Sequence, residues 1–503
     1  MFSRSWSTPA AEGSVGTASF VAGHGLWNGA QAAAAERVEA ALDGVDFVRL
    51  AFGDPHGLAR SKTLTARTFR GVLRNGMNYS PGPFLKDTAC TTAVDYRGEH
   101  GTGVEELAGL GNFVLVPDPL TFQVLPGGGG PVTAWVVGDE YLRDGTPHPL
   151  SSRGVLHRVL ARYAERGLSP VLGLEVEWYL SRRLDDDPGN AGKGFGRQGP
   201  APRVAAMNSG YQFNLDSAYD TVAPLTDPLA LDLLALGLPL RSMEHEMGPG
   251  QVETTFDPMS ALDTADAMLL FRTFTKQWCA RRGHHASFMS LPGIEGADPS
   301  GWHLNQSVLE DATGRNLFGA EGLSAGLSPE GKAYAQGLQS WLRELFLLSV
   351  PTVNGYHRLS AQHALSPTRV GLSLEDRTAM LRMVGSGAGA HLENRIGEPA
   401  ANPYLAVAAQ LFAGLEGLDG DPGPAGAAEP AGGGPDIVPQ SLREALDAFT
   451  AGRADQLLGA PLAACLAKLK ASEAGRYEAW ARQAAPAPGQ VTEWEQREYF
   501  AAF

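Results

Sequence analysis

The stretch SMEHEMGPGQVETTFDP, residues 242–258, places three glutamates around a Gly-Pro-Gly turn. Glu244 and Glu246 are two residues apart, so an extended strand would point both side chains to the same face. The turn residues favour a hairpin, and pairing of its two limbs would bring Glu246 and Glu253 together. Because like charges repel unless a cation lies between them, this pattern predicts a divalent-cation site that needs further oxygen ligands.

A second acidic pair lies in GLEVEWYL, where Glu175 and Glu177 are again two residues apart in an apolar strand. Burial of two uncompensated carboxylates would cost on the order of several kcal/mol. For one such pair alone, the solvated outer face of an edge strand is the better explanation. Two pairs, with His303 in GWHLNQSV and Glu393 in HLENRIGEP, instead indicate a set of hard ligands suited to two Mg²⁺ or Mn²⁺ ions.

The composition excludes several other classes of protein. The 503 residues suffice for two or three domains, and 43% hydrophobic with 19% charged residues is typical of a globular protein. A net charge of −15 argues against nucleic acid or an anionic membrane as partner. Three scattered cysteines without metal spacing, no membrane-length apolar run and no signal peptide predict a cytoplasmic location.

The chain divides into three expected regions. Residues 1–34, rich in small residues, are expected to be a flexible N-terminal segment. Residues 35–145 form a predicted first domain, in which VDFVRLAFGDPHGLARSKTL (45–64) indicates strand, turn and strand. Residues 146–503 form the predicted catalytic domain, with amphipathic helices expected over 151–167 and 264–283 and a Gly/Pro-rich flexible loop over 417–437.

From about residue 35 to the C-terminus, the chain resembles the glutamine synthetase superfamily. Eight stretches occur in the family's order: VRLAFGDPHGLARSK, GLEVEWYL, EHEMGPGQVE, SGWHLNQSV, PTVNGYHRL, DRTAMLRM, ENRIGEPAANPYLAVAAQLFAGLEGL and VTEWEQREYF. The resemblance implies an α+β fold: an N-terminal β-grasp domain and a catalytic domain with a curved antiparallel sheet surrounded by helices. It also implies a homo-oligomeric ring, a dodecamer or similar, in which a neighbour completes each site.

The resemblance assigns the six ligands to two metal ions. One ion falls to Glu177, Glu246 and Glu253, and the other to Glu175, His303 and Glu393. The implied reaction is ATP-dependent amide ligation with two or more Mg²⁺ or Mn²⁺ ions per site. A carboxylate takes the γ-phosphoryl group of ATP, and an amine then displaces phosphate from the acyl phosphate.

The resemblance also implies roles for residues that carry no metal. Arg358 and Arg395 match residues that hold the carboxylates of the acid substrate. Arg377 and Arg382 match those that steady the ATP phosphates and the transferred phosphoryl group, a task that suits the planar guanidinium. Asn305 and Ser307 fall at the nucleotide, and Asp54 matches the residue that binds the incoming ammonium across a subunit boundary. Taken alone, Asp54 would be a turn residue.

Three departures from the family pattern favour an unusual acceptor. The flap glutamate, which closes the site and accepts a proton from ammonium, is Ala364 here, with His363 beside it. The Asn-Gly pair that positions glutamate is Asp298-Pro299, and the second histidine of a His-x-His motif is Asn305. The set resembles the γ-glutamyl-amine ligase branch, which joins glutamate to polyamines, ethanolamine, alkylamines or aromatic amines. Without a flap base, the sequence predicts a primary amine larger than ammonia.

Two rival functions stay open on the sequence alone. One is a catalytically inactive paralogue that binds and regulates, which Ala364 and Asn305 favour and the six intact ligands oppose. The other is a kinase of the same fold, which would release ADP without consuming amine. Polyamines remain open as acceptors if Asp54 and other acids bind a second ammonium.

Overall fold

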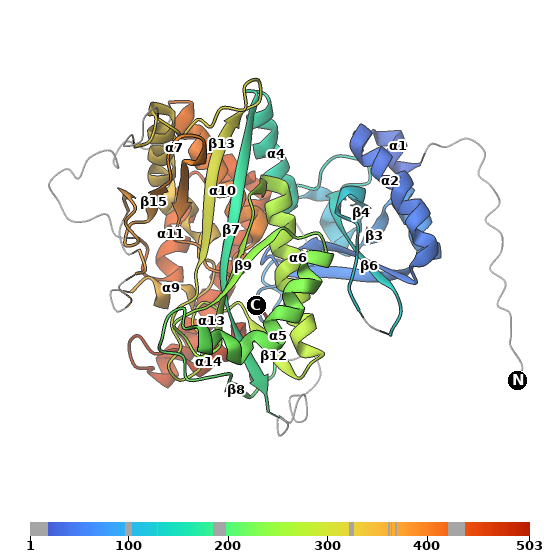
Figure 1. Cartoon of the computed structure of the whole chain (residues 1–503). Coiled ribbons are helices and arrows are strands. Elements are labelled where there is room, and N and C mark those ends of the chain that lie inside the picture. The colour runs from blue at the N-terminus through green and yellow to red at the C-terminus, as the bar shows by residue number, and fades with distance from the viewer. Residues whose placement is uncertain are drawn as a thin grey trace, which may run out of the picture.

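A computed structural model describes residues 19–95, 103–127, 129–184, 198–320, 326–360, 363, 365–367, 370–420 and 438–503. Its strands form two separate sheets that lie side by side (Figure 1). The first sheet lies between Phe47 and Tyr141 and the second between Leu168 and Asn394, so they fall on either side of the predicted boundary near residue 145. The exact domain limits stay a prediction.

The first sheet is mixed. In the described residues it contains β1 (Phe47–Gly53), β2 (Ala59–Thr65), β3 (Met77–Tyr79), β4 (Phe113–Pro117), β5 (Gln123–Val124) and β6 (Thr133–Tyr141). The order is β2-β1-β6-β4-β3, with β5 paired to β6; β1 and β6 are parallel and the other pairs antiparallel. Helix α3 (Ala66–Asn75) buries Phe69 and Leu73 against this sheet, as a β-grasp arrangement requires.

The N-terminal segment is more ordered than its composition predicts. Helix α1 (Phe20–His24) and helix α2 (Gly29–Ala41) begin inside the stretch expected to be flexible. Asn28 and Gln31 form a capping box at the start of α2, and Val21 and Ala34 are buried. The expectation is therefore wrong for residues 19–34, because capping and burial of small apolar side chains outweigh the low helix signal. Residues 1–18 lie outside the described part of the chain.

The second sheet carries the site. Within the described residues its ten strands are β7 (Leu168–Arg183), β8 (Val204–Ala206), β9 (Leu240–His245), β10 (Gln251–Phe256), β11 (Met259–Ser260), β12 (His284–Ser287), β13 (Trp302–Glu310), β14 (Leu372–Leu374), β15 (Leu381–Val384) and β16 (His391–Asn394). The order is β14-β15-β16-β13-β7-β10-β9, and β8, β11 and β12 also pair with β7. Because β7 pairs with five strands, it fixes the position of every other element of this sheet.

The predicted hairpin forms around the Gly-Pro-Gly turn. Strands β9 and β10 are antiparallel, with Glu244 opposite Glu253 and His245 opposite Val252. Gly250 has a φ of +78°, and a Cβ there would lie 2.4 Å from the carbonyl oxygen of Leu180. Only glycine fits a left-handed backbone this close to β7. The turn residue thus holds the hairpin against the central strand.

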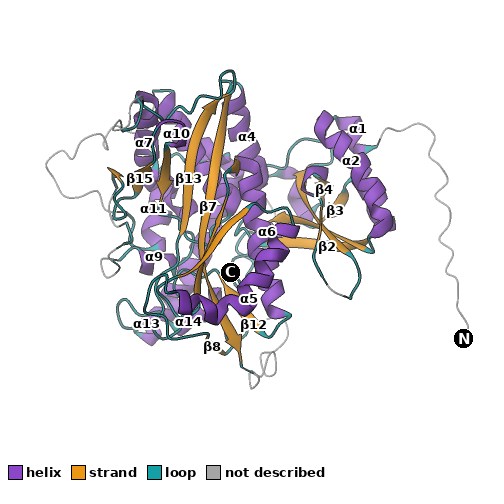
Figure 2. Ribbon diagram, viewed as in Figure 1, coloured by secondary structure: helices purple, strands orange, loops and turns teal. Residues whose placement is uncertain are grey.

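Helices cover the back of the second sheet (Figure 2). Helices α4 (Ser152–Ala164), α6 (Ala261–Ala280) and α10 (Pro403–Leu418) pack against one another, and α4 and α6 also pack on β7. The remaining α-helices of the described residues are α5 (Asp216–Ala235), α7 (Pro329–Ser340), α8 (Leu342–Ser349), α9 (Gly355–Arg358), α11 (Leu442–Ala451), α12 (Asp455–Leu458), α13 (Ala460–Ala484) and α14 (Glu493–Tyr499). Of the predicted 417–437 loop, residues 421–437 lie outside the described part. In the part described, no helix has both the length and the apolar character needed to span a bilayer.

A buried arginine connects the two sheets. The Arg153 side chain on α4, 2% exposed, donates to Asp118 after β4 (2.8 Å) and to Asp139 on β6 (2.7 Å). It also binds Asp266 on α6 at 2.8 Å. Three carboxylates from both parts of the chain therefore depend on one guanidinium.

Replacement of Arg153 by Met is expected to lower the free energy of unfolding by about 3–5 kcal/mol, because it leaves buried carboxylates without a partner. Arg162→Met on the same helix is the matched control, since the Arg162 side chain is 33% exposed and its ion pair with Glu416 is only partly buried. That change is expected to cost about 1 kcal/mol, less than the loss of Arg153. Urea unfolding measures both, and equal losses would contradict the assignment of Arg153 as the connection.

Candidate metal and substrate site

The side-chain alternation of three strands brings the predicted ligands to one face of the second sheet. On β7, Leu174, Val176 and Trp178 are buried under the helices, so Glu175 and Glu177 point to the opposite face. The strand register then places Glu253 of β10 opposite Glu177, and His303 of β13 opposite Glu175. Glu393 of β16 lies across from Asn305, two residues beyond His303.

Two groups of ligand atoms result, and they share one histidine. Atoms of Glu175, His303 and Glu393 all lie within 4.8 Å of one another, as do atoms of Glu177, Glu253 and His303. The first group has the same three residues as one predicted metal set. The second contains two of the other set, with His303 where Glu246 was expected. Glu246 stays a predicted ligand that lies outside both groups.

Hydrogen bonds fix the histidine and the central carboxylates. His303 Nδ1 lies 2.7 Å from Glu175 Oε1 and 3.5 Å from Glu393 Oε1. Glu177 Oε2 accepts from the backbone N–H of Gly301 at 2.9 Å and from Gln251 Nε2 at 3.2 Å. Gln251 is a site residue that the sequence analysis missed, although its place two residues before Glu253 on β10 signals the same face.

Burial and mutual repulsion of the carboxylates in this site favour the binding of a cation. Burial, followed by repulsion from Glu175, Glu177 and Glu246, raises the pKa of Glu253 far above its usual range. Burial, followed by the charges of Glu177, Glu244, Glu175 and Asp298, raises the pKa of Glu246 to about 8. Carboxylates that repel one another in a half-buried site fit a divalent ion with hard oxygen ligands. The donor set therefore suits Mg²⁺ or Mn²⁺.

The four predicted arginines differ in burial and in their contacts with the candidate metal site. Arg395 and Arg382 both bind Glu393, and Arg382 also donates to Glu375 at 2.8 Å. Arg358 is buried and donates to the carbonyls of Arg395 (2.8 Å) and Ile396 and to His303 Nε2 (3.2 Å). The contacts of Arg358 indicate a residue that positions the site. Arg377 is exposed on the turn after Asp376.

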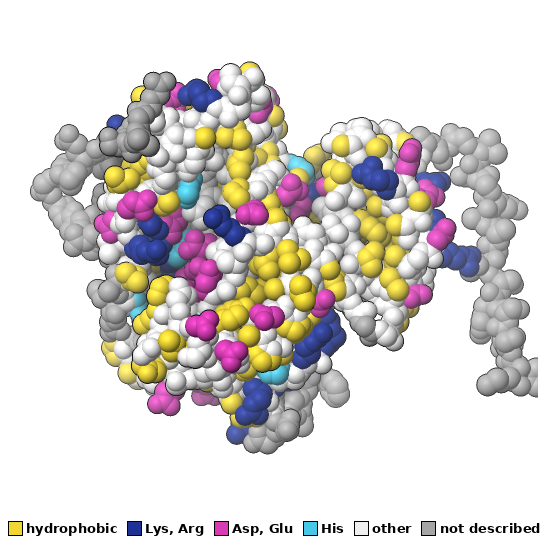
Figure 3. Space-filling model, viewed as in Figure 1, with side chains coloured by type: hydrophobic (Ala, Val, Ile, Leu, Met, Phe, Trp, Pro, Cys, Tyr) yellow, Lys and Arg dark blue, Asp and Glu magenta, His cyan; other side chains and the backbone are white. Residues whose placement is uncertain are grey.

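A cavity of about 610 Å³ adjoins the first metal group and contains the predicted nucleotide residues. Its lining includes Asn305, Ser307, Arg382, Glu175 and Glu393. Figure 3 shows acidic, basic and histidine side chains gathered on the face in front of the second sheet. The structure thus brings Asn305, Ser307 and Arg382 together, and their role at a nucleotide stays a prediction.

Of the two residues predicted at the amine site, Asp54 and Ala364, the structure describes only Asp54. Asp54 is fully buried in the turn between β1 and β2, where one oxygen accepts from the backbone N–H groups of His56 and Leu58. Its other oxygen binds Arg60 at 2.7 Å. These contacts favour the role of a turn residue, and the predicted ring with Asp54 facing a neighbour stays a prediction. Ala364 lies outside the described residues.

Asp298 lies at the edge of the site. The hydroxyl of Tyr179 on β7 accepts from the backbone N–H of Asp298 at 2.8 Å and donates to its carbonyl at 2.7 Å. Because Tyr179 is two residues from Glu177, this contact holds the Asp298 loop against the candidate metal site. Tyr179 was not singled out from the sequence, where it is one of three aromatic or apolar residues after Glu177.

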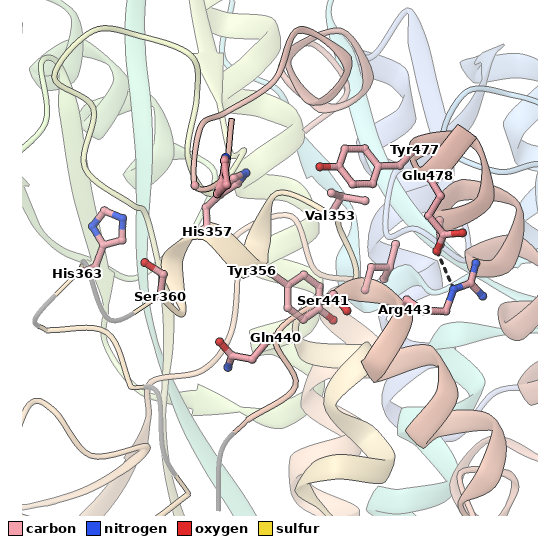
Figure 4. A pocket seen from close by; sticks show the side chains of 14 residues that line it. Val353, Tyr356, His357, Ser360, His363, Gln440, Ser441, Arg443, Tyr477 and Glu478 are labelled. Atoms are coloured by element: carbon pink, nitrogen blue, oxygen red, sulfur yellow. Dashed lines mark hydrogen bonds and ion pairs between the residues drawn. The ribbon is translucent and has the colours of Figure 1, made fainter. Parts of the chain in front are cut away.

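A second cavity, of about 600 Å³, contains none of the predicted metal ligands. Figure 4 shows its lining from α9, α11 and α13, with Tyr356, His357 and His363 on one side and Arg443 paired with Glu478 on another. The cavity lies on the side of α9 that carries Tyr356 and His357, whereas Arg358 of the same short helix reaches His303.

The comparisons with known proteins agree with this geometry. Residues 149–494 match the family model described as glutamine synthetase, catalytic domain, and the chain therefore belongs to the glutamine synthetase family. It is 36% identical to a gamma-glutamylanilide synthase of Acinetobacter sp, over 96% of this chain and 98% of that protein. It is 32% identical to gamma-glutamylethanolamide synthetase GlnA4 of Streptomyces coelicolor, over 75% of this chain and 77% of that one.

The solved structures confirm the predicted fold. The chain resembles a GmaS/ADP complex with a TM-score of 0.71 and 28% identity, over 92% of this chain and 98% of that one. It resembles apo GmaS with a TM-score of 0.69 and the same identity and coverage. The resemblance to the glutamine synthetase superfamily and to its γ-glutamyl-amine branch is confirmed, as is the prediction of an ATP-dependent carbon–nitrogen ligase.

Replacement of Glu253 by Gln tests the metal site. Without added metal, the variant is expected to melt at a higher temperature than the wild type, because a neutral amide removes repulsion among buried carboxylates. The stabilisation that Mg²⁺ or Mn²⁺ gives the wild type is expected to shrink or vanish. Thermal melts with and without each ion measure both effects.

Glu310→Gln, at the far end of β13, is the control for this variant, and it is expected to keep the full metal response. If Glu253→Gln retained the wild-type response, Glu253 would not be a metal ligand.

Proposed function

We propose that the protein joins the γ-carboxylate of glutamate to an aromatic primary amine, with ATP as the source of the phosphoryl group. The observation that carries this proposal is the full-length similarity to a gamma-glutamylanilide synthase, which covers nearly all of both chains. The carboxylate–histidine groups of the candidate metal site support a ligase that turns over ATP, because five of the six predicted ligands cluster there.

The residues of the chain divide this work between them. Glu175, His303 and Glu393 would hold one divalent ion and Glu177 and Glu253 another, and the bound ions would neutralise the ATP phosphates. Arg382, which lines the cavity beside Glu393, would contact the phosphates of the nucleotide. Arg395, held by Glu393, would meet the acid substrate, and the buried Arg358 would orient His303.

The acceptor follows from the chemistry of the amine. An aromatic amine is uncharged at pH 7 and can attack the acyl phosphate without first losing a proton, whereas ammonium cannot. Ala364 places no carboxylate at the position of the flap base and leaves space for a larger acceptor. The two rival functions are less favoured. A paralogue that only binds ligands would not need the intact set of predicted metal ligands. A kinase would not use an amine, so the loss of the flap glutamate at position 364 would have no consequence for its reaction.

With Mg²⁺, ATP and glutamate, the protein is expected to form γ-glutamylanilide from aniline, identified by its mass. We expect kcat/KM for aniline to exceed that for ammonia by at least about tenfold, with ethylamine and ethanolamine as aliphatic comparisons. Glu177→Gln is the inactive control. ADP release without amide would favour the kinase, and no ADP with any amine would favour the inactive paralogue.

Replacement of Ala364 by Glu is expected to raise kcat/KM for ammonia and to lower it for aniline, because the new carboxylate supplies a base and occupies space at the acceptor. Ser366→Glu, two residues further along, is the matched control for added charge and is expected to change neither value. Unchanged use of ammonia by Ala364→Glu would contradict the interpretation of position 364.

A further inference from the structure

Asp298, one of the departures from the family pattern, lies close to His363, the residue beside another departure in the sequence. His363 Nδ1 is 3.8 Å from Asp298 Oδ1, close enough for an ion pair when the imidazole is protonated. Asp298 belongs to the loop between β12 and β13, and His363 follows α9. Asp298 is a departure from the family pattern and His363 is the neighbour of another, Ala364, and the two side chains form a histidine–carboxylate pair.

The aspartate of this pair is fixed beside the candidate metal site. Tyr179 holds its backbone at both the N–H and the carbonyl, and Tyr179 follows Glu177 by two residues on β7. The charge of Asp298 also reaches Glu246, where it adds to the repulsion among the carboxylates. Its side chain is about half exposed, so the carboxylate itself stays free to orient a neighbouring group.

The histidine lies between this carboxylate and solvent. Its side chain is 24% exposed and lines the second cavity together with Ser360 (Figure 4). The titratable and charged groups of the described residues around that cavity are His357, which binds Glu495 at 2.7 Å, the ion pair of Arg443 with Glu478, and the phenols of Tyr356 and Tyr477. Asp298 is the acidic group closest to the imidazole among these, and the cavity offers a path by which a proton can leave.

We propose that His363 accepts the proton that the acceptor amine loses during amide formation, and that Asp298 positions its imidazole. This proposal rests on the proposed ligase function and identifies what replaces the flap carboxylate absent at position 364. A histidine held by a carboxylate is a common general base, because the carboxylate fixes the tautomer and stabilises the imidazolium.

The proton balance of the step is complete. The amine nitrogen attacks the acyl carbon, the new carbon–nitrogen bond forms, and the bond from carbon to the phosphate oxygen breaks. Nδ1 carries its hydrogen toward Asp298, so the lone pair of Nε2 takes one proton from the nitrogen. The products are the amide, inorganic phosphate and an imidazolium, which returns its proton to solvent through the cavity.

His363→Gln is expected to lower kcat for amide formation with aniline about 100-fold, the low end of what a general base contributes. Formation of the acyl phosphate does not use this base, so exchange of ¹⁸O between the β,γ-bridging and the β-non-bridging positions of ATP is expected to continue at the wild-type rate. His284→Gln, at a partly buried histidine on β12 that bonds the carbonyl of Arg282, is the matched control and is expected to change neither rate.

The pH profile separates catalysis from structural support. The wild type is expected to lose activity at low pH as the imidazole is protonated, and His363→Gln is expected to lack that acidic limb. Asp298→Asn is expected to lower kcat for amide formation and to leave isotope exchange unchanged, because the imidazole loses the carboxylate that orients it. Thermal melts check that each variant is folded.

Three results distinguish the alternatives. If His363→Gln kept the wild-type kcat and the acidic limb, the proposal would be wrong while the ligase function stood. If the variant lost isotope exchange as much as amide formation, His363 would support the acid substrate instead of the amine. If the wild type formed no amide with any amine, the proposed function itself would fail.

Discussion

Repulsion among carboxylates on one face of a sheet is the constraint on which the site depends. Strand β7 buries Leu174, Val176 and Trp178 under the helices, and its alternation forces Glu175 and Glu177 onto the other face. The neighbouring strands add Glu253 and Glu393 at matching positions. Such crowding is unfavourable without positive charge, so the apolar core behind the sheet and the cation-binding face in front of it are two consequences of the same strand pairing.

The arginines near this face bind residues of the candidate metal site. Arg382 and Arg395 both bind Glu393, and Arg358 reaches His303 from α9. Divalent ions that took over the carboxylates would weaken these ion pairs and leave Arg382 and Arg395 able to meet anionic substrates. The arginines therefore hold the carboxylates of the candidate metal site in place, and their planar donors suit the phosphate and carboxylate groups that we propose they meet.

Much of the fold and site could be predicted from residue spacing, and the exceptions have physical causes. Period-two alternation identified both acidic pairs and the hairpin, because strand geometry fixes where such side chains point. The formation of helices α1 and α2 was not predicted, because it depends on the burial of Val21 and Ala34 against other parts of the chain, which local composition does not reveal. Gln251 and Tyr179 were also missed as partners of the site, since hydrogen bonds across strands and loops depend on the register. Asp54 was identified by resemblance, whereas in the structure both of its carboxylate oxygens have partners within or near the turn: the backbone N–H groups of His56 and Leu58, and Arg60.

The division between strands and loops explains how one site can keep its metal chemistry while its acceptor changes. The clustered residues predicted to bind metal, Glu175, Glu177, Glu253, His303 and Glu393, lie on strands whose register is fixed on both sides, so a shift in one would disturb several pairings. Asp298 and His363 lie in loops, where a new side chain changes the local chemistry without altering the sheet. Side chains of two loops can form a histidine–carboxylate pair only if the fold already brings the loops together. The contact between Asp298 and His363 therefore supports the proposed route of the proton more strongly than the sequence position of either residue alone.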